Sequence, residues 1–236
     1  MKITVIVPAY NEEKTIGNIV QDINNILSRH YRDFEIIVMN DCSSDSTFEV
    51  VTQLKKQIKN LKIFTNKRNL GKTKTVIEGF KISDADVFSF IDADYQYDPL
   101  DLPKVIDKIV KEDFDICSGI RQNRKDNAYR LFMSWCFNIF NRLMFGIKVK
   151  DVNCGLKAIK RDVFNRIRIE YMQAPWFIDT ELLAKAYRKK LKITQVPIRH
   201  HARKEGSSKV SGVKLAAESI IFGIQLKLKF ILGKYR

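Results

Sequence analysis

The sequence predicts an α/β protein built around a mostly parallel central sheet. Through the first half of the chain, short apolar runs rich in β-branched residues alternate with segments of helical periodicity, which is the pattern of βαβ units. Polar loops follow three of these runs, at the sheet edge where open parallel sheets bind ligands. With 236 residues and 45% hydrophobic content, the chain is long enough for one domain with a full core.

The expected elements of the first half follow from these patterns in chain order. The apolar runs predict strands at 3–7, 35–39, 61–65 and 87–91. Helical periodicity between them predicts helices at about 13–28, 46–58 and 72–82. Near residue 120 the alternation of strands and helices gives way to an aromatic-rich helix.

The second half contains two segments that are more apolar than a surface helix requires, at 129–146 and 213–232. Five polar residues recur at helical spacing in the first of them: Arg130, Ser134, Asn138, Asn141 and Arg142. An amphipathic helix on a membrane surface explains this composition, and a buried core helix with a polar seam is the alternative. No segment reaches the roughly 18 uninterrupted apolar residues of a membrane-spanning helix.

The charge balance predicts a polyanionic partner. Lys and Arg number 42 against 27 Asp and Glu, for a net charge of +15, which suits nucleic acid, an anionic membrane or phosphorylated substrates. The four cysteines are widely separated and lack metal-ligand spacing, which favours a reduced chain. The first residues lead directly into an apolar stretch, so we expect no export signal.

Acidic and amide side chains gather in the loops after the predicted strands. Asp92, Asp94 and Gln96 follow the fourth strand and offer oxygen ligands for Mg²⁺ or Mn²⁺ beside a diphosphate. A capped turn before Pro99 is the alternative for an isolated D-x-D. The loops after the first two strands favour the metal site, and Asp41 in the second loop is our candidate for the polar edge of a nucleotide base.

Spacing excludes two other kinds of nucleotide site. A Walker A motif ending at Gly71-Lys72-Thr73 requires glycine at position 66, where the chain has Asn66. No G-x-G-x-x-G sequence follows a predicted strand, so the dinucleotide fingerprint is also absent. Lys72 remains a candidate helix-start cation for a phosphate or base contact.

Seven motifs in order carry a resemblance to a known family. They are V-P-A-Y-N-E at 7–12, N-D-C-S-S-D-S-T at 40–47, N-L-G-K at 69–72, D-A-D-Y-Q at 92–96, D-V-N-C-G-L-K at 151–157, F-I-D-T-E-L-L at 177–183 and R-K-E-G-S-S-K at 203–209. The chain resembles family 2 glycosyltransferases of the GT-A fold over nearly its whole length, and within them the dolichol-phosphate mannose synthase or polyprenyl-phosphate glycosyltransferase group. The resemblance implies a Rossmann-like nucleotide-diphospho-sugar transferase fold with amphipathic interface helices.

The resemblance also assigns roles to residues. Those implied to bind the nucleotide sugar are Pro8, Ala9, Tyr10, Glu12, Asp41, Lys72 and Asp92. Those implied to hold Mg²⁺ or Mn²⁺ are Asp92, Asp94 and Gln96. Those implied to act in transfer are Asp94, Arg130, Ser134, Arg203 and Lys209, with Arg130 and Ser134 receiving the acceptor phosphate. We also expect Arg121 among the cations around phosphates.

The implied reaction moves a hexose, with mannose favoured, from a nucleotide sugar to a polyprenyl (dolichyl) phosphate with inversion. GDP-mannose is the favoured donor and UDP-glucose the second candidate. A phosphate monoester is mostly dianionic at pH 7, so the acceptor needs no general base. A hydroxyl acceptor, the alternative, would need one, and Asp179 or Glu181 is the candidate. A non-enzymatic basic protein that binds membrane or nucleic acid is more remote, because charge does not explain the ordered acidic motifs.

These expectations divide the chain into parts. Residues 1–212 form the glycosyltransferase domain, with a donor half at 1–120 and an acceptor half at 121–212 that contains the interface helix 129–146. Residues 213–236 form a C-terminal amphipathic helix at the membrane surface, where flanking lysines meet anionic headgroups. We expect a peripheral protein on the cytoplasmic face of a membrane. A membrane-anchoring partner subunit is a further candidate, and nucleic acid is not expected as a partner.

Overall fold

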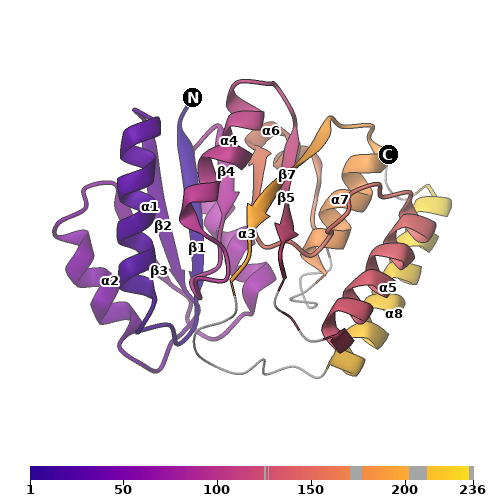
Figure 1. The fold of residues 1–236 in the computed structure, drawn as a ribbon, viewed down its shortest axis with the longest axis horizontal. Helices are drawn as coiled ribbons and strands as arrows, with labels where there is room; N and C mark the ends of the chain where they lie inside the picture. The colour runs from indigo at the N-terminus through magenta and orange to yellow at the C-terminus, as the bar shows by residue number, and fades with distance from the viewer. Residues whose placement is uncertain (125, 127, 171–176, 202–211, 234–236) are drawn as a thin grey trace.

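A computed structural model of the chain describes residues 1–124, 126, 128–170, 177–201 and 212–233, and it has helices on both faces of one sheet (Figure 1). The strands are β1 (Ile3–Ala9), β2 (Phe34–Asn40), β3 (Leu61–Thr65), β4 (Val87–Phe90), β5 (Ile116–Gln122), β6 (Lys157–Lys160) and β7 (Ile193–Arg199). The helices are α1 (Ile16–His30), α2 (Thr47–Lys55), α3 (Lys72–Ile82), the 3₁₀ helix η1 (Pro99–Asp101), α4 (Leu102–Val110), α5 (Ala128–Phe145), α6 (Arg161–Arg166), α7 (Ile178–Arg188) and α8 (Gly212–Ile231).

The seven strands lie in the order β3-β2-β1-β4-β6-β5-β7. β1 pairs in parallel with β2 and β4, and β5 pairs in parallel with β7. β6 is antiparallel to both of its neighbours. The prediction of a mostly parallel sheet is therefore confirmed. The strand order reverses between β1 and β4, which is where open α/β sheets leave a crevice for ligands at the carboxyl ends of the strands.

Two hydrophobic cores fill the two faces of the sheet. One face packs against α1, α2 and α4, and the other against α3, α6 and α7, with part of α8 joining the second core. Side chains of β1 alternate between them, since Val5 and Val7 enter the first core and Ile6 the second. Burial on both faces explains why β1 and β2 are nearly continuous apolar runs in the sequence.

The predicted elements of the first half agree with the structure to within a few residues. The strand at 61–65 and the helix at 72–82 have the predicted bounds. The first helix begins later than predicted, at Ile16, because the carbonyl of Glu12 first accepts hydrogen bonds from the backbone N–H groups of Thr15 and Ile16 in a turn. Three strands of the second half, β5, β6 and β7, were not predicted.

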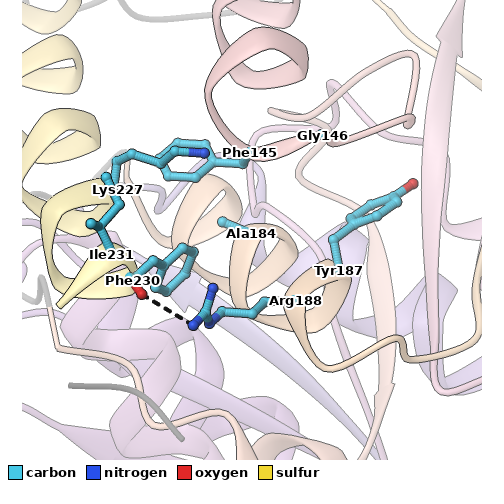
Figure 2. A pocket seen from close by; sticks show the side chains of 8 residues that line it. All are labelled: Phe145, Gly146, Ala184, Tyr187, Arg188, Lys227, Phe230 and Ile231. Atoms are coloured by element: carbon cyan, nitrogen blue, oxygen red, sulfur yellow. Dashed lines mark hydrogen bonds between the residues drawn. The ribbon is translucent and has the colours of Figure 1, made fainter. Parts of the chain in front are cut away.

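Helices α5 and α8 lie side by side at one end of the molecule, beyond α7 (Figure 1). The ring of Phe140 on α5 packs against α8 at Gly223, where an added Cβ would lie 2.7 Å from Cζ of Phe140. A surface pocket forms where the C-terminal ends of the two helices meet α7 (Figure 2). There Arg188 donates to the carbonyl of Phe230 at 3.1 Å, and Lys227 donates to that of Met144 at 2.6 Å. These two cations therefore cap helix ends that carry negative partial charge.

The polar stripe of α5 is divided, with Asn138 and Asn141 facing the body of the protein while Arg130 and Arg142 are exposed. Asn138 accepts a hydrogen bond from the backbone N–H of Val152 at 3.0 Å, and Asn141 is the one buried residue of the helix. Apolar side chains point outward instead, with Phe132 58% exposed and Trp135 59% exposed. A buried core helix is thereby excluded for α5.

Helix α8 exposes apolar side chains as well, namely Ile220, Ile221, Ile224, Leu228 and Ile231. We call α5 and α8 the apolar helix pair. Within the described ranges, neither helix has both the length and the apolar character needed to cross a bilayer.

Candidate functional site

The loops after β1, β2 and β4 meet at the carboxyl edge of the sheet, as predicted from the sequence. The backbone N–H of Asp41 donates to the carbonyl of Ala9 at 2.8 Å. Asn11 accepts from the backbone N–H of Ser44 at 2.8 Å and donates its own backbone N–H to the Ser43 hydroxyl at 3.0 Å. These hydrogen bonds join the first two loops into one wall of the site.

The four residues predicted for the nucleotide in the first loop lie in this wall. Pro8 and Ala9 end β1, and Ala9 is buried. The Tyr10 side chain is 40% exposed, so its ring offers an aromatic surface at the mouth of the site. The backbone N–H of Glu12 donates to the Thr47 hydroxyl at 2.9 Å, which fixes the start of the loop against α2.

Asp41 builds the neighbouring loop. Its buried carboxylate accepts hydrogen bonds from the Asn66 amide at 2.7 Å and from the backbone N–H groups of Leu70 and Gly71, both at 2.8 Å. These contacts hold the turn that leads into α3, whose first residue is Lys72. A contact between Asp41 and a nucleotide base stays a prediction, to which the structure adds this role in shaping the loop.

Lys72 and Asp92 form an ion pair across the crevice. The Lys72 ammonium lies 2.6 Å from Oδ1 and 2.8 Å from Oδ2 of Asp92. Desolvation lowers the pKa of Lys72, but the charges of Asp92, Asp179 and Asp94 outweigh it and raise the pKa above its ordinary value. The structure thus brings together a protonated lysine and three carboxylates, of which only Asp179 was not predicted for the donor site.

The D-x-D loop is held from both sides. Asp94 accepts a hydrogen bond from the backbone N–H of Gln96 at 3.0 Å. Gly155 lies against Asp92, since an added Cβ would come within 2.7 Å of Oδ2. The alternative interpretation of the D-x-D was a capped turn before Pro99. The residue that caps this turn is Asp98, which accepts from the backbone N–H of Leu100 at 2.9 Å at the start of η1. Asp94 therefore makes a local turn bond of its own, whereas no capping bond accounts for Asp92 in the described residues.

The D-x-D residues fit a divalent cation that shares its ligands with a diphosphate. Mg²⁺ and Mn²⁺ bind through one or two carboxylates when phosphate oxygens complete the shell. Asp92 and Asp94 supply that number, and the close approach of Gly155 keeps space beside Asp92 free of a side chain. No group of three or more His, Cys, Asp or Glu side chains in the described part of the chain could hold a metal by itself. A cation held by Asp92 and Asp94 would need the phosphate oxygens of a bound donor to complete its shell.

A buried ion pair lies behind the donor site. Lys157 has no exposed surface, and its ammonium lies 2.7 Å from Oδ1 of Asp179. It also donates to the carbonyl oxygens of Val152 and Cys154. Lys157 is the last residue of the motif at 151–157, and the only sequence signal for this buried role is a lysine beside the apolar residues Leu156, Ala158 and Ile159.

The two residues considered as a general base are both enclosed. The Asp179 side chain is 10% exposed and paired with Lys157. Glu181 has no exposed surface, lies 2.7 Å from the Lys185 ammonium, and accepts from the backbone N–H of Glu170 at 2.7 Å. Both carboxylates are thus paired with a lysine, and a role as general base would require each to release that partner.

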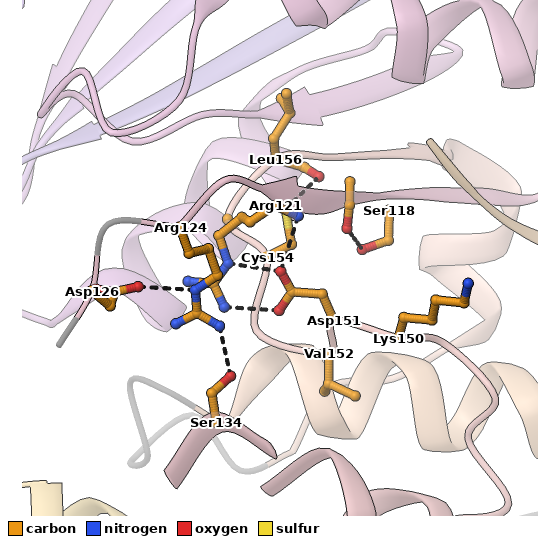
Figure 3. A network of polar contacts seen from close by, with 12 residues as sticks. Ser118, Arg121, Arg124, Asp126, Ser134, Lys150, Asp151, Val152, Cys154 and Leu156 are labelled. Carbon is orange, nitrogen blue, oxygen red and sulfur yellow. Dashed lines mark hydrogen bonds and ion pairs between the residues drawn. The ribbon is translucent and has the colours of Figure 1, made fainter. Parts of the chain in front are cut away.

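The predicted acceptor side forms a polar network at the end of β5 and the start of α5 (Figure 3). Arg121 binds both carboxylate oxygens of Asp151, at 2.7 and 2.8 Å, so its guanidinium is already paired. Ser134 accepts a hydrogen bond from Arg124 at 2.8 Å. Arg203 and Lys209, the other two cations predicted here, lie outside the described residues.

Two residues of this network were missed from the sequence. Asp126 lies 2.9 Å from Nε of Arg124 and 3.5 Å from Nη1 of Arg130. The network therefore contains the predicted Arg130 and Ser134 together with Arg124 and Asp126. Three basic residues followed by one acid in 121–126 were the available signal, but this pattern does not say which charges meet.

The sequence of the chain matches known glycosyltransferases. Residues 4–168 match the profile of Glycosyl transferase family 2. Dodecaprenyl-phosphate galacturonate synthase of Rhizobium johnstonii is 26% identical over 214 residues, which cover 89% of this chain and 62% of that protein. Undecaprenyl-phosphate 4-deoxy-4-formamido-L-arabinose transferase of Salmonella choleraesuis is 27% identical over 216 residues, covering 91% of this chain and 64% of that protein. The chain thus spans less than two thirds of the length of either relative.

The fold matches solved glycosyltransferase structures. Glucosyl-3-phosphoglycerate synthase from Mycobacterium tuberculosis in complex with uridine diphosphate superposes with a TM-score of 0.76 at 18% identity, over 96% of this chain and 80% of that one. The same enzyme with Mn²⁺, uridine diphosphate and phosphoglyceric acid superposes with a TM-score of 0.72 at 18% identity, over 96% and 78% of the two chains. At this identity the likeness establishes the architecture, and the predicted GT-A fold is confirmed.

Proposed function

This chain belongs to Glycosyl transferase family 2, and from that premise we propose that it transfers a sugar from a nucleotide sugar to the phosphate of a polyprenyl lipid. The observation that carries the proposal is the pairing of two sites at one sheet edge. The acidic crevice around Lys72 and Asp92 suits a donor diphosphate, and the arginine network at the start of α5 suits a second phosphate. The two relatives described above are named for polyprenyl-phosphate acceptors.

The donor half of the reaction rests on residues 1–120. Asp41 and the loop it holds, together with Tyr10, form the wall against which a base and ribose bind. Lys72 exchanges its ion pair with Asp92 for the diphosphate, so its positive charge offsets the charge that grows on the departing nucleoside diphosphate. A bound Mg²⁺ or Mn²⁺, held by Asp92 and Asp94 with Gln96 nearby, supplies further stabilisation of that charge.

The acceptor half rests on the network around Arg130 and Ser134. A phosphate monoester bound there is mostly dianionic at pH 7 and is nucleophilic without a general base. Its oxygen attacks the anomeric carbon from the face opposite the leaving diphosphate, which inverts the configuration. The enclosed positions of Asp179 and Glu181 support a phosphate acceptor over a hydroxyl acceptor, which would need one of them as base.

The apolar helix pair suits the lipid environment of such an acceptor. Phe132 and Trp135 expose more than half of their surface, and Arg130 and Arg142 of the same helix are exposed beside them. An amphipathic helix with outward aromatic side chains and flanking arginines binds the interfacial region of a membrane. We therefore infer that α5 and α8 rest on the membrane, with the arginine network at headgroup level.

The proposal also concerns which sugar is transferred and which nucleotide carries it. Mannose from GDP-mannose is the donor favoured by the sequence motifs, with UDP-glucose second. The two relatives are named for galacturonate and for a formamido-arabinose. Their names share a polyprenyl-phosphate acceptor but differ in the sugar. A donor screen must therefore include hexoses, a uronic acid and an amino-sugar derivative.

The test is a transfer assay with the full chain on vesicles that contain a short polyprenyl phosphate. A panel of nucleotide sugars is supplied with Mg²⁺, Mn²⁺ or chelator, and the product is identified by mass spectrometry and its anomeric configuration by NMR. We expect one donor to yield a polyprenyl-phosphate sugar of inverted configuration only with metal. The matching polyprenol, which lacks the phosphate, is the control acceptor. Transfer to polyprenol, or hydrolysis of every donor without transfer, overturns the proposal.

A further inference from the structure

A carboxylate occupies the centre of the arginine network. Asp126 lies between Arg124, at 2.9 Å from Nε, and Arg130, at 3.5 Å from Nη1. The Asp126 side chain is only 8% exposed, while that of Arg130 is 57% exposed. Two guanidinium groups that converge on one anion have the arrangement in which arginines bind phosphate.

The same network contains polar groups set to receive a ligand. Arg124 already donates to the Ser134 hydroxyl at 2.8 Å, which places its guanidinium beside a residue predicted for the acceptor phosphate (Figure 3). His200 packs its ring against Tyr97 close by, is 8% exposed, and its Nδ1 is buried without a hydrogen-bond partner in the described part of the chain. A buried nitrogen without a partner is costly, so a ligand that pairs with it is favoured.

The charges distinguish this cluster from its neighbour. Arg121 and Asp151 form a closed bidentate pair of zero net charge. Arg124, Arg130 and Asp126 together carry one positive charge, and without Asp126 the two arginines match the charge of a dianionic phosphate. Asp126 is therefore the one anion of the described network whose displacement leaves a site with the charge of a phosphate monoester.

We propose that Arg124 binds the acceptor phosphate together with Arg130 and Ser134, and that Asp126 holds the place of this phosphate until a lipid phosphate displaces it. The inference rests on the proposed function, because it concerns the acceptor site of that reaction. When no acceptor is bound, Asp126 keeps the two arginines oriented and offsets the repulsion between their positive charges. It also makes the site selective, since a neutral alcohol cannot replace the carboxylate and a monoanionic phosphodiester replaces it less well than a dianion does.

Steady-state kinetics on Asp126→Asn and Arg124→Gln test the inference. Asparagine keeps the shape of the side chain and removes the competing charge, so we expect the KM for short polyprenyl phosphate to fall about tenfold while the donor KM stays unchanged. Arg124→Gln removes a guanidinium, and we expect the acceptor KM to rise at least about tenfold with the donor KM unchanged. Asp162→Asn, which removes an exposed ion pair with Arg166 on α6, is the matched control and should change neither KM.

A second measurement separates this inference from the proposed function. Calorimetry with inorganic phosphate as the probe should give a lower Kd for Asp126→Asn and a higher Kd for Arg124→Gln than for the unchanged chain. Melting temperature of each variant verifies that it is folded. If the unchanged chain transfers sugar to lipid phosphate but Asp126→Asn raises the acceptor KM or leaves it constant, the inference fails and the function stands. If no transfer occurs, the proposed function is wrong. If the Kd values for phosphate are also not lower for Asp126→Asn and higher for Arg124→Gln, the inference is wrong as well.

Discussion

Lys157 of β6 and Asp179 of α7 form an ion pair inside the protein, with 2.7 Å between Nζ and Oδ1. The ammonium also binds the carbonyl oxygens of Val152 and Cys154, so it fastens the segment before β6 to the start of α7. The charge of Asp179 acts on Lys72 as well, which connects this interior pair to the donor site. The pair therefore joins the segment before β6 to α7 close to the Lys72–Asp92 ion pair.

Replacing Lys157 by methionine should destabilise the fold strongly. The change leaves Asp179 charged and enclosed without a partner, and breaking a buried pair from one side costs about 3–5 kcal/mol of unfolding free energy. The double variant Lys157→Met with Asp179→Leu removes both charges and should recover much of that loss. Urea denaturation measures each value. Lys81→Met breaks an exposed pair with Glu78 and should cost less than about 1 kcal/mol; an equal cost for both lysines would contradict the argument.

Asp41→Ala should impair donor binding and leave acceptor binding intact. The change removes the acceptor of three hydrogen bonds that hold the loop before α3, so the loop and Lys72 lose their fixed position. We expect the donor KM to rise at least about tenfold, since hydrogen bonds to a charged group contribute about 1.5–3 kcal/mol each. Kinetics with the donor and the acceptor varied separately measure the effect.

Glu35→Gln is the control for the Asp41 variant. Glu35 lies near the start of β2, the strand that Asp41 directly follows, and has the same 4% exposure, but it binds Thr4, Ser83 and Lys62 at the opposite end of the sheet. This variant should lose stability without a change in donor KM. A donor KM that rises equally in both variants would mean that general loosening of β2, and not the loop, is responsible.

The first half of the fold was predictable because apolar side chains dominate the strands in the middle of the sheet. All seven residues of β2 are buried, and five of them, Phe34 and Ile36–Met39, are large and apolar. In contrast, β5 buries Cys117, Ser118 and Gly119, and β6 buries the charged Lys157. The ammonium of Lys157 finds its partners in α7 and in the segment just before β6, so no alternation of apolar and polar residues marks this segment as a strand.

The candidate site was predictable to the extent that topology determines it. Loops that follow parallel strands must meet at one edge, which brings Asp41, Asp92 and Asp94 together irrespective of side-chain detail. Which charged side chains pair in the second half depends on how β5 and α5 are oriented, and no local sequence pattern reveals that orientation. Asp126 is the example: its two partners are near it in sequence, but only the conformation of the turn into α5 decides that both guanidinium groups reach its carboxylate.

Asp94→Ala should abolish metal-dependent transfer while the fold is retained. The carboxylate lies at the sheet edge outside both hydrophobic cores, so its loss removes a predicted metal ligand without opening a cavity. We expect kcat to fall by at least about a hundredfold in saturating Mg²⁺ or Mn²⁺, the scale of losing one electrostatic contact to the transition state. Asp98→Ala, in the same loop, removes the cap of η1 and should lose about 1 kcal/mol of stability but keep most of its turnover. Turnover by Asp94→Ala close to that of the unchanged chain would refute the metal assignment.

The apolar helix pair should bind membranes through its outward aromatic side chains. Phe132→Ser or Trp135→Ser removes a side chain whose burial in the interface contributes about 1.5–3 kcal/mol, so each change should weaken binding to anionic phospholipid vesicles at least about tenfold. Co-sedimentation with vesicles measures the affinity, and added salt should weaken it further because the flanking arginines and lysines contribute through charge. Leu100→Ser is the matched control, since Leu100 is 55% exposed on η1, which lies against α1 away from the helix pair. Equal losses from Leu100 and Trp135 would show nonspecific adhesion and remove the basis for placing α5 on the membrane.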